Sequence, residues 1–147
     1  MIIGLALIFL SLLIKLGLPP FHGWLVEIYD SIPYFLVLFY SIFVKLAFLF
    51  LLIRFILMLE IAVETFFIFM FLFVIILSFI IGCIGGLGHT RLRRILAFSS
   101  IFNAGTMLLP IVYGQQLQTS IVFMIMYAMY YMFSMLGVVL VLMYAQS

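Results

Sequence analysis

The chain has 147 residues, of which 70% are hydrophobic and 7% are charged, and its formal net charge is +2. This composition leaves too little polar surface to cover a water-soluble globule, so the sequence predicts an all-α protein embedded in a membrane. Six basic residues are too few to follow a phosphate backbone, which excludes nucleic acid as a partner. The single cysteine, Cys83, excludes an intrachain disulfide and a cysteine-ligated metal or iron–sulfur site.

The first expected element covers residues 2–29 and is interrupted by Pro19 and Pro20. Proline lacks an N–H donor and clashes with the carbonyl four residues before it, so the helix is expected to break just after Lys15. A broken helix is tolerated in a bilayer only where protein or water surrounds the freed backbone. Lys15 is therefore expected near the middle of the element, in a hydrated interior position.

The start of the chain, residues 1–13, has no basic residue before its apolar run, no cleavage pattern after it, and no Arg-rich or amphipathic character. These features disfavour both a signal peptide and an import presequence. They favour synthesis inside the compartment whose membrane the chain enters.

A second span is expected over residues 33–57, after the turn signal that ends at Pro33. Lys45 lies ~18 Å into this span, at mid-depth, where an ammonium group costs about 2.5–3.5 kcal/mol. A lysine in a low-dielectric site can load or unload its proton after a small structural change. Two such lysines, Lys15 and Lys45, suit a proton relay; the alternative is an ion-paired or snorkelling lysine.

Three further spans are expected over residues 66–86, 90–113 and 117–144, which gives about five spans in one membrane domain, residues 1–147. The fourth span carries polar residues at helical spacing, which either line a water path or make ordinary hydrogen bonds between helices. They are Ser99, Ser100, Asn103 and Thr106. Polar residues of the fifth span are expected to serve packing: Tyr127, Tyr130, Tyr131 and Ser134.

Arg91, Arg93 and Arg94 form the basic cluster of the chain. The positive-inside rule places them on the cytoplasmic or organellar matrix side as a topology anchor. The alternative is a functional relay or a site for lipid headgroups. Alternating spans place the segment from His22 to Asp30 on the same side.

Three further titratable residues lie in that segment. His22 is expected at the mouth of the relay, where it passes protons near neutral pH, or as a helix-end histidine satisfied by the backbone. Glu27 and Asp30 are either surface carboxylates or the groups through which protons enter. A haem held by His22 and His89 is disfavoured because both fall on one membrane side. The sequence shows no catalytic triad and no metal-ligand spacing.

Two motifs carry a resemblance to a known family. The segment from Lys15 through Pro19-Pro20 to Trp24, followed by Glu27 and then Lys45, resembles transmembrane helices 7 and 8 of the antiporter-like subunits of respiratory complex I, within their NADH dehydrogenase subunit 2 branch. Residues 88–101 are similar to the family's Thr-x-x-Arg-x-x-x-Tyr-Ser-Ser-Ile segment. The sequence departs from the family pattern at Phe98, where tyrosine is usual, and at Asn103, where histidine is frequent. The fifth span matches by position only.

The resemblance implies a function and a place for these residues. Lys15 and Lys45 are expected on the central hydrophilic axis, and the three arginines are expected to face the matrix. The chain is then a fragment of a proton-translocating antiporter-like subunit of NADH:ubiquinone oxidoreductase, without a catalytic site of its own. The alternatives are a component of a cation/proton antiporter and a structural membrane bundle that does not transport.

The resemblance also implies partners. The family's helix with the glutamate that pairs with the Lys15-type lysine is not found in this sequence, so a split subunit is expected, with a second chain that carries the remaining helices. Other membrane-arm subunits of complex I and membrane lipids are the further partners. FMN, iron–sulfur clusters and ubiquinone are expected on other subunits, with no cofactor or metal on this chain. The expected location is the mitochondrial inner membrane, ahead of a bacterial plasma membrane.

Overall fold

The computed structural model describes residues 2–58, 64–113 and 117–145, and every regular element in these ranges is a helix. This confirms the predicted all-α class. The elements are α1 (Ile2–Leu16), α2 (Gly23–Ser31), α3 (Tyr34–Phe39), a π-helical turn η1 (Tyr40–Val44), α4 (Lys45–Met58), α5 (Glu64–Leu87), α6 (Leu92–Tyr113) and α7 (Leu117–Tyr144).

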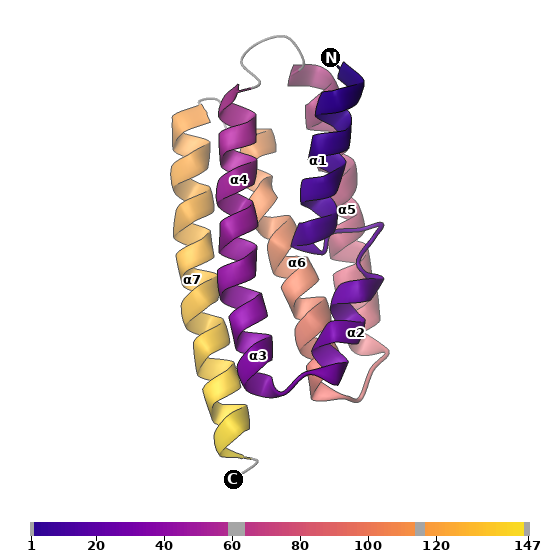
Figure 1. Cartoon of the computed structure of the whole chain (residues 1–147), viewed down its shortest axis with the longest axis vertical. Coiled ribbons are helices and arrows are strands. Elements are labelled where there is room, and N and C mark those ends of the chain that lie inside the picture. Colours follow the sequence, from indigo (N-terminus) through magenta and orange to yellow (C-terminus); the bar gives the residue numbers. More distant parts are fainter. Residues whose placement is uncertain (1, 59–63, 114–116, 146–147) are drawn as a thin grey trace.

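Four stretches among the described residues are long and apolar enough to cross a membrane: Tyr34–Leu57, Phe67–Leu87, Leu92–Val112 and Gln118–Tyr144. The first of them runs through α3, η1 and α4 as one continuous rod (Figure 1). A shorter apolar helix, Ala6–Leu16, belongs to α1. The chain is therefore a multi-pass membrane protein. The first predicted element is present as two short helices, α1 and α2, which lie end to end along one side of the bundle.

The break between α1 and α2 depends on Gly17 as well as on the prolines. Gly17 has a φ of 73°, a left-handed conformation that glycine adopts without steric cost. Its N–H donates to the carbonyl of Ile14, and the N–H of Leu18 donates to the carbonyl of Leu13, both at 3.0 Å. This pair of bonds is a Schellman C-cap, which ends the helix at Leu16 before the prolines begin. The Pro19–Pro20 peptide is cis.

Trp24 joins the two halves of the broken element. Its indole Nε1–H donates to the carbonyl oxygen of Ile14 at 3.0 Å, across the interruption. The last turn of α1 therefore has both a glycine cap and a side-chain donor from α2. The sequence alone did not indicate this contact.

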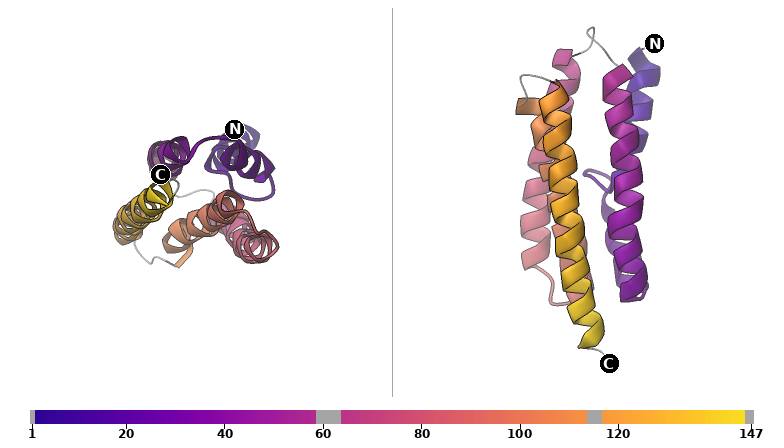
Figure 2. Two further views of the ribbon diagram at one scale, coloured as in Figure 1. Left: turned by 90° about the horizontal axis from the view of Figure 1, so that it is seen from below. Right: turned by 90° about the vertical axis from the view of Figure 1, so that its left-hand side faces the viewer.

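The remaining helices pack in a defined order. In the end-on view of Figure 2, α7 lies beside α6 and the α3–α4 rod, while α5 lies against α6 at the other edge. The α5–α6 contact is close because Gly82, Gly85 and Gly105 lie where a β-carbon would overlap Phe102, Phe98 and Ser78, respectively. α1 packs on α4, and α2 packs on α6.

A small apolar cluster fixes α2 against α6 and α3. Its buried members are Leu25, Tyr29, Val37, Ala97, Phe98 and Ile101. This cluster carries the hydroxyl of Tyr29 into the centre of the bundle, where it meets polar groups from the other helices.

Candidate functional site

Lys45 is the buried cation of the bundle. It is the first residue of α4, directly after the π-helical turn η1, and 5% of it is exposed. Its Nζ donates to the backbone oxygen of Ser100 at 2.6 Å and also to the Ser100 hydroxyl. The Nζ lies 5.7 Å from the centre of the Tyr131 ring. Lys45 on the α3–α4 rod is therefore tied to α6 and faces α7.

A cluster of hydroxyl groups lies around Ser100, the residue to which Lys45 donates. Tyr29 from α2 and Tyr131 from α7 each place a phenol oxygen 3.3 Å from Ser100 Oγ. The Tyr29 hydroxyl also lies 2.7 Å from Ser41 Oγ, and Ser41 donates to the carbonyl of Val37 at 2.7 Å. We call Tyr29, Ser41, Ser100 and Tyr131 the hydroxyl cluster. Each of its members is at most 2% exposed.

The partners of Lys45 in the described part of the chain are neutral. They are the two oxygens of Ser100 and the ring of Tyr131. No carboxylate among the described residues contacts the ammonium. A lysine held by neutral oxygens can lose or regain its proton without separating an ion pair, which suits a relay group.

Lys15 lies in a different environment. It is exposed on the last turn of α1, and its Nζ lies 5.3 Å from the centre of the Phe48 ring on α4. Phe48 is one helical turn after Lys45, so the two lysines belong to neighbouring parts of the α1–α4 contact. Among the described residues, no carboxylate forms an ion pair with Lys15.

His22 lies immediately before α2 and is half-buried. Its Nδ1 is shielded from solvent and has no hydrogen-bond partner among the described residues, so the backbone does not satisfy this ring nitrogen. The His22 ring lies 6.5 Å from the Phe98 ring, and His89 stacks on the same Phe98 ring at 5.4 Å. The role of His22 at the mouth of a relay stays a prediction.

The three predicted anchor arginines converge on the C-terminal end of α2. Arg91 and Arg94 form ion pairs with the Asp30 carboxylate at 3.1 and 2.8 Å. Arg93 donates to the Asp30 backbone oxygen at 3.3 Å, and its guanidinium lies 4.8 Å from the centre of the Tyr34 ring. We call Asp30 and these three arginines the arginine clamp.

The arginine clamp keeps Asp30 ionised. The hydrogen bond from Arg94 is the main cause of a lowered pKa for the Asp30 carboxyl; burial opposes it, and the charges of Arg94 and Arg91 add to it. Arginine side chains at the carboxyl end of α2 also complement the helix dipole. Glu27, the other carboxylate of α2, is exposed. The clamp thus brings together two groups of residues that the sequence placed on one membrane side.

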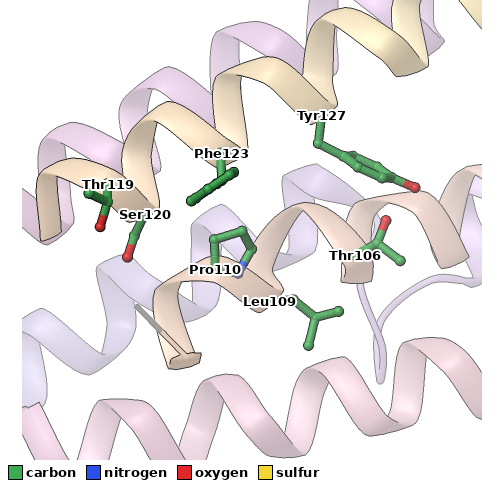
Figure 3. Close-up of a pocket in the computed structure, with 7 residues that line it drawn as sticks. All are labelled: Thr106, Leu109, Pro110, Thr119, Ser120, Phe123 and Tyr127. Carbon is green, nitrogen blue, oxygen red and sulfur yellow. The ribbon is translucent and has the colours of Figure 1, made fainter. Parts of the chain in front are cut away.

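An apolar groove lies between α6 and α7, and the residues given as its lining carry no charge (Figure 3). Phe123 and Pro110 face each other across its middle, and Thr106 and Tyr127 lie at one end. The remaining lining residues are Leu109, Thr119 and Ser120. Tyr127 donates to Asn103 Oδ1 at 2.8 Å, which is an ordinary hydrogen bond between helices. Of the polar residues at helical spacing on α6, Ser100 is the one that contacts Lys45.

Sequence reasoning missed Tyr29 and Ser41 as parts of the site. Ser41 had a usable signal, because it is a polar residue in an apolar span and lies four residues before Lys45, on the same face of an ideal helix. Tyr29 had no such signal in the sequence, since its hydrogen-bond partners come from η1 and α6. Tyr131, which was expected to serve packing, is buried and also donates to Ser100.

Comparison with known proteins identifies similar sequences. A family model described as NADH:quinone oxidoreductase/Mrp antiporter, TM, matches residues 1–147. The chain is 34% identical over 129 residues to NADH-quinone oxidoreductase subunit N of a Wolbachia species, which covers 86% of this chain and 28% of that protein. It is 33% identical over 129 residues to NADH-ubiquinone oxidoreductase chain 2 of Dictyostelium discoideum, which covers 87% of this chain and 26% of that protein. The chain therefore spans less than a third of the length of these relatives.

Proposed function

Because this chain belongs to the NADH:quinone oxidoreductase/Mrp antiporter family of membrane proteins, we propose that it forms part of the proton-translocating membrane arm of an NADH:quinone oxidoreductase. Its contribution is a segment of the proton path, with Lys45 as the relay group. The observation that carries the proposal is that Lys45 is buried at the centre of a membrane bundle and bound by neutral oxygens. A permanently ionised lysine with a structural role is normally paired with a carboxylate when buried.

In this proposal Lys15 and His22 extend the path from Lys45. Lys15 reaches it across the α1–α4 contact, where its Nζ lies over Phe48. His22 precedes α2 at the interruption, with an unpaired Nδ1 available for a proton or a water molecule. Glu27 lies on α2 between this interruption and the arginine clamp, and Asp30 of the clamp lies at the end of the same helix.

Residues outside this chain are proposed to complete the path. Lys15 is exposed on the bundle, and the relatives extend well beyond the region that this chain matches. We place the carboxylate that pairs with Lys15 on one of those other helices, carried by a second chain. The intact mass of the chain in the purified assembly, together with its co-purifying subunits, tests whether the subunit is divided.

The redox chemistry is proposed to lie on other subunits, which hold FMN, the iron–sulfur clusters and ubiquinone. The sequence has one cysteine, so it offers no thiolate set for a cluster. We propose the mitochondrial inner membrane as the location. The relatives include both a Dictyostelium and a Wolbachia protein, so they favour neither the mitochondrial nor the bacterial setting.

The test replaces Lys45 with methionine in the assembled complex and measures NADH-driven proton translocation in sealed vesicles. Loss of a proton-transferring group predicts a decrease on the order of 10²-fold. Arg54→Met is the matched control, because Arg54 is an exposed cation on the same helix. Normal translocation in an assembled Lys45→Met complex would overturn the proposal and leave a structural bundle as the function.

A cation/proton antiporter is the second candidate, because the matching family description also names Mrp antiporters. Proton exchange that requires sodium or potassium and proceeds without NADH would favour it. The same vesicles distinguish the two functions when NADH and the cation are supplied separately.

A further inference from the structure

We propose that Tyr29 is a positioning residue for Lys45, and that its hydroxyl orients the Ser100 hydroxyl so that oxygen lone pairs face the lysine ammonium. Tyr29 reaches Ser100 from α2, whereas Lys45 reaches it from the α3–α4 rod. The inference rests on the proposed relay role of Lys45. It adds a group that acts on the relay through Ser100.

The direction of the hydrogen bonds follows from counting donors. A hydroxyl group has one hydrogen to donate and two lone pairs with which to accept. Ser41 uses its hydrogen on the carbonyl of Val37, so it can only accept from Tyr29. Tyr29 then has no second hydrogen and must accept from Ser100.

The same count of donors and acceptors determines the direction of the hydrogen bonds at Ser100. Its one hydrogen points to Tyr29, which leaves its lone pairs for the two donors that remain, Lys45 and Tyr131. The chain of bonds is complete, since it begins at the Lys45 ammonium and ends on a backbone carbonyl. In this arrangement Ser100 is an acceptor towards Lys45 and therefore favours the protonated lysine.

Removing the Tyr29 hydroxyl weakens that preference, although the backbone oxygen of Ser100 still accepts from Lys45. Ser100 then loses the acceptor for its hydrogen and can turn it towards Lys45, whose neutral amine has a lone pair to accept it. The protonated lysine loses an acceptor and the neutral lysine gains a donor. Tyr29 thus controls how readily Lys45 holds its proton.

Among the described residues, few other titratable groups lie around Lys45. α7 presents Tyr131, α2 presents Tyr29, and α1 presents Lys15, which lies over Phe48. The charged groups of the arginine clamp engage one another at the end of α2. Ser100 is therefore the point at which a change on α2 reaches Lys45.

The arginine clamp gives α2 a second role in this proposal. Asp30, which follows Tyr29 directly, is held by arginines from the first turn of α6 and from the residue before it. The same helix α6 carries Ser100. The clamp therefore fixes the distance between the Tyr29 hydroxyl and the Ser100 hydroxyl that donates to it.

The experiment measures the pH profile of NADH-driven proton translocation by the assembled complex carrying Tyr29→Phe. This change keeps the ring in its apolar cluster and removes only the hydroxyl. We expect the alkaline limb of the profile to move about one unit towards lower pH, as loss of one charge-assisted hydrogen bond predicts. Tyr127→Phe is the matched control: it also removes a hydrogen-bonded hydroxyl from a tyrosine beside α6, but its partner is Asn103.

A double substitution separates positioning from packing. Because Tyr29 acts through Ser100, Tyr29→Phe is expected to produce no further shift in a Ser100→Ala complex. Ser41→Ala tests the same chain of hydrogen bonds at its other end, because it frees the Tyr29 hydrogen to turn towards Ser100. It is expected to move the pH profile in the same direction as Tyr29→Phe does. The Ser41→Ala complex tests the role of Tyr29 if the Tyr29→Phe complex does not assemble.

The outcomes are distinct. An unchanged profile in an assembled Tyr29→Phe complex would overturn the inference, as would an equal shift in Tyr127→Phe or a shift that persists on Ser100→Ala. If Lys45→Met abolishes translocation while Tyr29→Phe has no effect, only the role of Tyr29 fails. If Lys45→Met has no effect, the proposed function fails.

Discussion

Lys45 and Lys15 have the same side chain, lie on packed neighbouring helices, and were predicted together, yet their environments differ. Lys45 contacts Ser100 on α6 and Tyr131 on α7, and hydroxyls from α2 and η1 extend this network behind Ser100. Lys15 is exposed and lies over one aromatic ring. The chain therefore supplies hydrogen-bond partners for Lys45, whereas it covers Lys15 on one face only.

Chemical modification should show the largest difference between the two lysines. A membrane-permeant amine reagent is expected to modify Lys15 at least about tenfold faster than Lys45 in the purified chain, because reaction at Lys45 requires local opening of the bundle. Mass spectrometry of the proteolysed chain measures both rates. In the assembled complex, Lys15 is expected to become protected. Equal rates in the purified chain would show that the Lys45 site is not closed.

Removing one of the two acceptors of Lys45, the Ser100 hydroxyl, should have the next largest effect. Ser100→Ala is expected to destabilise the folded chain by about 1–2 kcal/mol, because the buried lysine loses a hydrogen-bond partner in an apolar environment. Unfolding by denaturing detergent, followed through the fluorescence of the single tryptophan, Trp24, measures the change. Ser99→Ala is the control, since Ser99 is the exposed neighbour on the same helix. Equal losses for the two variants would contradict the assignment.

The arginine clamp acts on the Lys45 site because it holds α2, and with it the Tyr29 hydroxyl, against α6, where Ser100 binds Lys45. Asp30→Asn is expected to lower the unfolding midpoint by less than Ser100→Ala does, since ion pairs that stay partly open to water contribute little. Glu27→Gln, which changes an exposed carboxylate of the same helix, is expected to leave the unfolding midpoint unchanged.

The pH dependence of the clamp has a defined sign. The folded chain lowers the pKa of the Asp30 carboxyl, so the stabilisation is present above the ordinary value of 3.8 and is lost as the pH falls through the lowered pKa. The parent chain and Asp30→Asn should therefore converge in acid. A difference that grows in acid would exclude the ion pair as its cause.

The contact of Lys15 with Phe48 should show the smallest effect. Phe48→Leu keeps an apolar side chain and removes the aromatic face, which costs about 0.5–1 kcal/mol for an exposed cation. The same unfolding assay measures it, with Phe50→Leu as the control because Phe50 is an exposed phenylalanine of the same helix. No difference between the two variants would mean that the ring contributes only apolar surface.

The sequence predicted those features that have a local cause. The helical class followed from composition, and the break after Lys15 followed from Pro19 and Pro20, although Gly17 forms the cap that ends α1. The burial of Lys45 followed from its depth in an apolar span. Asp30 and the arginines were placed on one side by counting spans, and the structure joins them.

Features that depend on packing between helices were not predictable in the same way. The acceptor of Lys45 comes from 55 residues away along the chain, and Tyr29 meets Ser100 across 71 residues. Nothing near Tyr29 distinguishes it from the other tyrosines of this chain. The reach of Trp24 to Ile14 likewise appears only when α1 and α2 are placed end to end.

The π-helical turn η1 has a consequence for how the position of Lys45 is encoded. The rod packs on α7 through α3 and on α1 through α4, so its contact face changes at η1. A π-helical turn holds one residue more than the α-helical turn it replaces, so η1 absorbs most of the rotation of about 100° that one extra residue would otherwise give to every residue after it. Lys45 follows η1 directly, so the direction in which it points depends on the winding of this turn. Loss of one residue from η1, with a return to α-helical winding, should therefore turn Lys45 far less than loss of one residue from a regular helical turn.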